Sequence, residues 1–208
     1  MSQIILDFGS GNTCRNNPLI IKQMINELKA INTGKHEVII KWQLFEKAGE
    51  NTPLSHPIFD IAYDYAKEKG YKTTSSVFDL ESLKFLLNYD VPFIKIANRR
   101  DLDWLIGEVP RKIPVYVSVP KVPLDFARQS ERFGNTRYML CVSEYPAKIE
   151  DYEKNNCFME SISDHTIGLD LFKKYQPLIW EKHYKLPDSQ GLDAGPFAIT
   201  PEELREVL

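Results

Sequence analysis

The sequence has few cysteines, no large excess of either charge and no apolar run long enough to cross a membrane. Its three cysteines, Cys14, Cys141 and Cys157, do not have the spacing of a metal finger. They are therefore interpreted as reduced thiols of a cytoplasmic protein. The net charge of -3 gives no electrostatic reason to expect nucleic acid or an anionic membrane as a partner. The N-terminus lacks the pattern of a signal peptide, so we expect a cytoplasmic location.

A dinucleotide-binding loop is also missing. Gly9 and Gly11 follow the first apolar run, but the residues after them do not continue as G-x-G-x-x-G. An open doubly wound sheet is therefore the less favoured of two fold classes. The chain shows no internal repeat, low-complexity tract or linker, and hydrophobic residues make up 43% of it. Residues 1–208 are expected to form a single domain.

Short apolar runs alternate with segments that have helical spacing. Strands are expected at 4–8, 37–43, 72–78, 91–97, 113–118 and 138–143, followed by two runs that lead to His165 and His183. Helices are expected to begin at Pro18, near Ser55, after Asp79 and after Thr200, with others at 102–109, 123–133, 147–155 and 166–174. About eight strands that alternate with helices are typical of a compact α/β fold of the (β/α)8 TIM barrel type.

Polar residues stand at the carboxyl ends of these strands, where a parallel barrel binds its ligands. They are Asp7, Lys41, Gln43, Ser76, Lys95, Ser118, Ser143, Ser163, His165 and His183. The short segment between the last two strands brings the two histidines together, and two imidazoles can hold a divalent metal. The lysines and hydroxyls suit a phosphate or a carboxylate. Alternatively, the histidines are polar strand ends without a ligand, and Lys41 is an edge residue that reaches solvent.

Seven short motifs follow one another along the chain: Lys41-Trp42-Gln43, Ser75-Ser76-Val77-Phe78-Asp79, Lys95-Ile96-Ala97-Asn98, Cys141-Val142-Ser143-Glu144-Tyr145-Pro146, Ser163-Asp164-His165-Thr166-Ile167-Gly168, Glu181-Lys182-His183 and Gly191-Leu192-Asp193. In the same order, they resemble the motifs KFQ, STPFD, KIAS, HCTSxYP, SDHTxG, EKH and GPDH of the sialic acid synthase family, the N-acetylneuraminate (NeuB-type) synthases and their relatives. Each match alone is weak, but seven in order over 4–208 are specific.

The resemblance implies a transferase that condenses phosphoenolpyruvate with an N-acylated amino sugar aldehyde such as N-acetylmannosamine. The enol carbon attacks the aldehyde, water adds to the resulting oxocarbenium centre, and phosphate leaves. By motif, His165 and His183 would hold a divalent metal, with Mn²⁺ favoured and Mg²⁺ left open. The substrate-binding candidates are Lys41, Gln43, Ser76, Lys95, Ser118, Ser143, Tyr145, Ser163 and Asp193. The catalytic candidates are Asp7, Lys95, Asp101 and Asp193.

The chain also departs from the family's pattern. An acidic residue often follows KIAS, but here the equivalent segment is Asn98-Arg99-Arg100, which leaves Asp101 as the candidate for proton transfer. No C-terminal antifreeze-like (SAF) domain is expected within 1–208, and a homodimer is left open. A second hypothesis is therefore a non-catalytic or regulatory barrel that keeps the pocket. A third is an aldolase-like or phosphate-processing barrel with another substrate.

Overall fold

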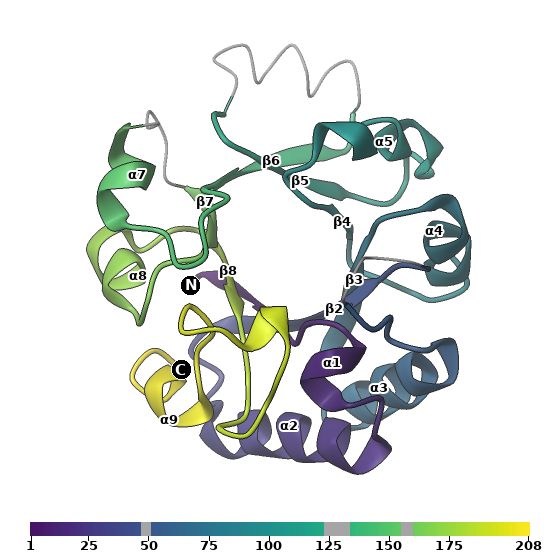
Figure 1. Ribbon diagram of the computed structural model, residues 1–208, viewed down its shortest axis with the longest axis horizontal. Helices are drawn as coiled ribbons and strands as arrows, with labels where there is room; N and C mark the ends of the chain where they lie inside the picture. The colour runs from purple at the N-terminus through teal and green to yellow at the C-terminus, as the bar shows by residue number, and fades with distance from the viewer. Residues whose placement is uncertain (47–50, 123–133, 155–159) are drawn as a thin grey trace.

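The computed structural model describes residues 1–46, 51–122, 134–154 and 160–208, which form a closed barrel of parallel strands (Figure 1). The strands are β1 (Gln3–Asp7), β2 (Glu37–Leu44), β3 (Lys72–Val77), β4 (Ile94–Ile96), β5 (Val115–Val119), β6 (Thr136–Cys141), β7 (Ser161–Asp164) and β8 (Ile179–His183). Each strand pairs with the next along the chain, and β1 also pairs with β8 to close the barrel. The predicted TIM barrel is therefore confirmed, and an open doubly wound sheet is ruled out.

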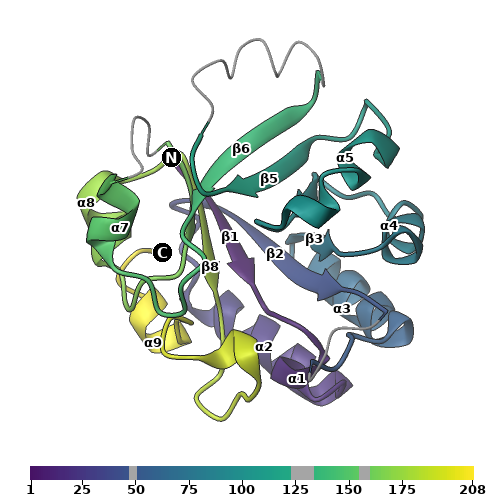
Figure 2. The same cartoon turned by 45° about the horizontal axis from the view of Figure 1, so that its top comes forward.

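Helices form the outer ring of the barrel (Figures 1 and 2). They are α1 (Gly11–Cys14), α2 (Pro18–Ile31), α3 (His56–Glu68), α4 (Leu80–Leu86), α5 (Leu105–Glu108), α7 (Ile149–Lys154), α8 (Asp170–Tyr175) and α9 (Pro201–Leu204), with 3-10 turns η1 (Arg100–Leu102) and η2 (Leu192–Ala194). The helix expected at 123–133 lies outside the described residues. Of the helices that the structure describes, none has the length and apolarity needed to cross a membrane.

Three helices begin where their capping residues predict. The side chain of Asn17 accepts a hydrogen bond from the backbone N–H of Leu19 at the start of α2. Asp79 caps α4 in the same way. At α9, Thr200 and Glu203 form a complete capping box.

Two of the segments that differ from the sequence-based expectation follow strands β1 and β7. No helix is expected between the first strand and Pro18, but Gly11–Cys14 form the short helix α1. The helix expected from Thr166 begins only at Asp170, because Gly168 has a left-handed backbone with φ of +70°. The residues between β7 and α8 are therefore a loop, and this loop carries His165.

The strands alternate between two apolar environments. Odd-numbered β1 and β2 residues such as Ile5 and Ile39 belong to a cluster inside the barrel, with Phe93, Tyr116, Met139 and Ile179. Their even-numbered neighbours, including Leu6 and Trp42, pack in the larger cluster that the helices share. The inner cluster fills one end of the barrel and leaves the other end to polar side chains.

Candidate active site

A cavity of about 570 Å³ opens at the carboxyl ends of the strands. It is lined by all but one of the residues predicted to form the site: Asp7, Lys41, Gln43, Ser76, Lys95, Ser118, Ser143, Tyr145, Ser163, His165, His183 and Asp193. The exception is Asp101, which lies on η1 with 61% of its side chain exposed and pairs with Arg99. Arg99 itself lines the cavity, whereas the carboxylate expected to replace the family's acidic residue does not.

The inner apolar cluster forms the floor of this cavity. Six of its residues, Ile5, Ile39, Phe93, Tyr116, Met139 and Ile179, each precede a cavity residue by two positions. Those cavity residues are Asp7, Lys41, Lys95, Ser118, Cys141 and Glu181. Since side chains two apart on a strand point to the same face, one apolar layer closes the barrel and a polar layer follows it.

A chain of buried polar contacts crosses the cavity from β1 to β3. Lys41 Nζ donates to Asp7 Oδ2 at 2.6 Å and to Ser76 Oγ at 3.0 Å. The Gln43 amide donates to Asp7 and to Asp193, at 2.9 Å each. Burial acts to raise the pKa of Asp7, but the Lys41 ammonium, His183 and the hydrogen bonds from Lys41 and Gly9 together hold the pKa well below its usual range. Asp7 is therefore an ionised carboxylate that holds Lys41 in place.

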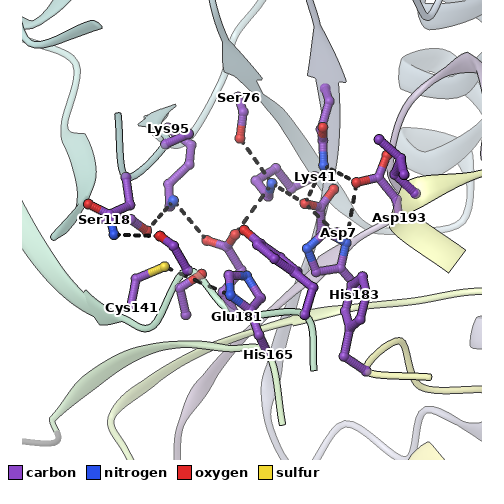
Figure 3. Close-up of a pocket in the computed structure, with 18 of the residues that line it drawn as sticks. Asp7, Lys41, Ser76, Lys95, Ser118, Cys141, His165, Glu181, His183 and Asp193 are labelled. Atoms are coloured by element: carbon purple, nitrogen blue, oxygen red, sulfur yellow. Dashed lines mark hydrogen bonds and ion pairs between the residues drawn. The ribbon is translucent and has the colours of Figure 1, made fainter. Parts of the chain in front are cut away.

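Glu181 lies between the two lysines at the centre of the cavity (Figure 3). Its Oε1 is 3.4 Å from Lys41 Nζ, and its Oε2 is 3.4 Å from Lys95 Nζ. Lys95 also donates to Ser118 Oγ at 2.6 Å. Burial acts to raise the pKa of Glu181, but Lys41 and Lys95 more than offset this and lower the pKa. Glu181 thus places one negative charge against both ammonium groups, and Lys41 also faces Asp7.

His165 is held by contacts on its backbone and on its ring. Its Nδ1 lies 2.7 Å from the carbonyl oxygen of Val142, and its backbone N–H donates to the Tyr152 hydroxyl at 2.9 Å. A carbonyl only accepts, so Nδ1 carries the hydrogen and Nε2 keeps its lone pair. Burial lowers the pKa of His165 from 6.5 to about 3. The imidazole is consequently neutral near pH 7, the form that binds metals.

His183 lies beside His165, with ring centroids 5.5 Å apart. Its Nδ1 is 3.7 Å from both Asp7 Oδ2 and Asp193 Oδ1, and this buried atom has no hydrogen-bond partner among the described residues. Closeness of the two histidines, which the sequence predicts from the short segment between β7 and β8, is therefore confirmed.

These residues fit a divalent metal held by two protein side chains. The neutral His165 ring and the unpartnered His183 nitrogen are nitrogen donors that suit first-row metals. Within 1–46, 51–122, 134–154 and 160–208, no three His, Cys, Asp or Glu side chains gather closely enough to hold an ion. The remaining ligand positions would therefore belong to water or a substrate.

A second buried network holds the loop that carries His165. Asp164 Oδ1 accepts from the Thr166 N–H and hydroxyl at 2.7 Å each, and Asp164 Oδ2 accepts from Trp180 Nε1 at 2.9 Å. Lys182, which is as deeply buried, lies 3.3 Å from Asp164 Oδ2 and donates to the Thr166 carbonyl. The backbone on both sides of His165 is thereby fixed.

Asp193 reaches the cavity from η2, far from β1 in the sequence. Its Oδ2 accepts from the backbone N–H of Ser10 at 3.1 Å. Gly9 makes this approach possible, since it has φ of +79° and a Cβ on it would lie 2.8 Å from Asp193 Cβ. Two aromatic rings lie near the histidines. The centroid of the Tyr145 ring is 4.2 Å from that of His165, and the centroid of the Phe197 ring is 5.0 Å from that of His183.

Sequence reasoning did not assign Glu181, Cys141, Asn98 or Phe197 to the site, although all four line the cavity. For Glu181 and Cys141 a signal exists, because each follows an apolar inner residue by two positions on its strand. Asn98 donates to Ser143 Oγ at 2.8 Å, a contact between two separate loops that no local pattern indicates. Phe197 likewise arrives through a loop whose path the sequence does not define.

A model of the NeuB family matches residues 26–208. The structure resembles the N-acetylneuraminic acid (sialic acid) synthetase of Leptospira borgpetersenii, with 22% identity and a TM-score of 0.75 over 98% of this chain and 80% of that one. A putative spore coat polysaccharide biosynthesis protein E of Chromobacterium violaceum gives 19% identity and a TM-score of 0.79 over 99% and 72%. A truncated 3-deoxy-D-arabino-heptulosonate 7-phosphate synthase of Thermotoga maritima gives 13% and 0.65 over 99% and 83%. No curated protein matches significantly by sequence.

Proposed function

Because the chain belongs to the NeuB family, we propose that it condenses phosphoenolpyruvate with an N-acylated amino sugar aldehyde and releases phosphate. The observation that carries the proposal is the pairing of two sites in one cavity. Lys41 and Lys95 offer two buried ammonium groups for an anion, and His165 and His183 stand beside them. A sialic acid synthetase and a spore coat polysaccharide protein among the structural neighbours agree with a role in sugar biosynthesis.

The lysines and hydroxyls would bind phosphoenolpyruvate. An ammonium supplies point charge and a hydroxyl supplies a directed hydrogen bond, and both recognise phosphate or carboxylate oxygens. Ser76 and Ser118 already contact Lys41 and Lys95, so each lysine comes with a neighbouring hydroxyl. After the carbon–carbon bond has formed and water has added, the C–O bond of the phosphate ester breaks. The same cations would stabilise the phosphate that leaves.

The acceptor aldehyde would lie nearer the histidines, Asp7 and Asp193. A divalent metal on His165 and His183 would polarise the aldehyde and favour negative charge on its oxygen. That oxygen takes up a proton to become a hydroxyl, while water adds to the cationic carbon left on the phosphoenolpyruvate side. Asp7 and Asp193 are the carboxylates that face this part of the cavity, and Gln43 holds them in place by hydrogen bonds to both.

The direct test is phosphate release from phosphoenolpyruvate in the presence of Mn²⁺, with N-acetylmannosamine and a panel of related aldoses. We expect release that depends on one sugar and stops when a chelator removes the metal. Phosphate release that does not depend on a sugar would contradict the proposal, and so would the absence of release with each of the aldoses tested. Replacement of His165 by alanine should abolish Mn²⁺ binding measured by calorimetry, and unchanged affinity would refute its assignment as a ligand.

One observation favours the second candidate, a barrel that binds these ligands without turnover. Arg99 lines the cavity in the segment where family members often carry an acidic residue, and Asp101, the candidate for proton transfer, lies outside the cavity lining and pairs with Arg99. Arginine stays protonated near neutral pH and cannot act as the base. Tight binding of phosphoenolpyruvate without phosphate release for any sugar would support this candidate.

A further inference from the structure

The anion position between Lys41 and Lys95 already holds a carboxylate. Glu181 is only 4% exposed, and each of its oxygens faces one ammonium group at 3.4 Å. In Figure 3 its side chain rises from β8 to lie between the lysines of β2 and β4. A small anion that enters the cavity meets the same two ammonium groups, and Arg99 adds a further cation to the lining.

The contacts of Glu181 are weaker than those of the other groups around it. Lys41 approaches Asp7 to 2.6 Å and Lys95 approaches Ser118 to 2.6 Å, both shorter than the distances to Glu181. Glu181 Oε2 is buried and accepts no hydrogen bond from the described residues. Charge attraction alone therefore links this oxygen to Lys95, and a ligand oxygen with better geometry can replace it.

The two lysines differ in their dependence on Glu181. Lys41 keeps a carboxylate partner, Asp7, whether Glu181 is present or not. Among the ion pairs of the described residues, Lys95 has Glu181 as its carboxylate and no other. Removing this charge would leave Lys95 bound to a hydroxyl and a backbone carbonyl, and its attraction for an external anion would rise.

We propose that Glu181 is a resident anion that competes with the substrate's carboxylate or phosphate for Lys41 and Lys95. The competition lowers the affinity of the site for small anions and favours release of the phosphate product. The inference deepens the proposed function and depends on it for the identity of the anion. Glu181 also supplies a countercharge to the two buried lysines, since an unpaired buried ammonium is costly.

Replacement of Glu181 by glutamine tests the competition, because the amide keeps the shape and removes the charge. Binding of inorganic phosphate and of pyruvate is measured by calorimetry in metal-free buffer. We expect both dissociation constants to fall by about tenfold or more in Glu181→Gln. Glu37→Gln is the matched control, as Glu37 also pairs with a lysine at 2.8 Å but lies at the opposite end of β2. Its affinities should equal those of the wild type.

Equal or weaker anion binding by Glu181→Gln would overturn the inference, since Glu181 would then order the lysines rather than compete with ligands. Absence of binding to both proteins would also overturn it. If the glutamine variant does not fold, Glu181→Asp replaces it: the shorter side chain cannot reach both lysines, so phosphate should bind about threefold tighter or more. Failure of sugar-dependent turnover leaves this result unaffected, so the two hypotheses are tested separately.

Discussion

The buried, neutral ring of His165 should be one of the main reasons why the protein loses stability at mildly acidic pH. The ring is 4% exposed, and its Nδ1 hydrogen is committed to the Val142 carbonyl. Burial, followed by the nearby His183, lowers the pKa of His165 to about 3. In the unfolded chain the same imidazole has its ordinary value of 6.5. Below that value the unfolded state takes up a proton that the folded state does not, so stability must fall as the pH falls.

The size of the effect follows from the two pKa values. When the pH falls from about 7.5 to about 5, it ends roughly 1.5 units below the pKa of the unfolded imidazole, which becomes protonated. The folded imidazole stays neutral over the same range. At about 1.36 kcal/mol per unit, His165 should cost about 2 kcal/mol of unfolding free energy. The loss continues until the pH approaches the folded value of about 3.

Urea unfolding of the wild type and of His165→Asn at the two pH values isolates this term. The asparagine amide can still donate to Val142, but it does not titrate. With a chelator present in every sample, the wild type should lose about 2 kcal/mol more than the variant on going from about pH 7.5 to about pH 5. Equal losses would show that the folded ring accepts a proton, and would refute the assignment of a buried neutral imidazole.

Three further substitutions test other parts of the structure. Lys95→Met should weaken phosphoenolpyruvate binding by about tenfold or more, because a buried cation is lost; calorimetry with wild-type affinity would contradict this. Lys182→Met should destabilise the fold by about 3 kcal/mol in urea unfolding, as it leaves Asp164 buried without its ion pair; a loss below about 1 kcal/mol would show that hydrogen bonds alone suffice. Gly9→Ala should cost more than Gly34→Ala, since both have positive φ but only Gly9 lacks room for a Cβ; equal unfolding free energies would refute the steric argument.

Much of the fold could be predicted because its signals are local. Asn17 and Asp79 cap helices through contacts that span two or three residues, and the apolar runs mark the strands. The starts of β4 and α8 were placed too early. Pro92 has no N–H to pair, and Gly168 has a left-handed backbone, so each element begins after them. Both effects depend on backbone geometry that periodicity does not report.

The candidate site was likewise predicted only in part from the sequence. Residues at strand ends, such as Lys41 and His183, were predicted from topology, because a parallel barrel gathers the ends of all its strands. Asp101 was expected to reach the cavity, yet it pairs with its neighbour Arg99 and stays in solvent. No pattern in the sequence distinguishes a loop that turns inward from one that turns outward. Glu181 was assigned no role, although strand alternation places it with His183.

The alternation of β8 explains why its four residues Trp180, Glu181, Lys182 and His183 form one continuous motif. Glu181 and His183 point into the cavity, where they meet the lysines and the carboxylates. Trp180 and Lys182 point to the other face, where both contact Asp164 and so fix the loop that carries the second histidine. The register pairs Asp164 with Lys182. A slip of one residue would exchange the two faces and bury an indole where the anion site needs a carboxylate. The strand therefore sets the anion site and the histidine pair together, and neither can shift without the other.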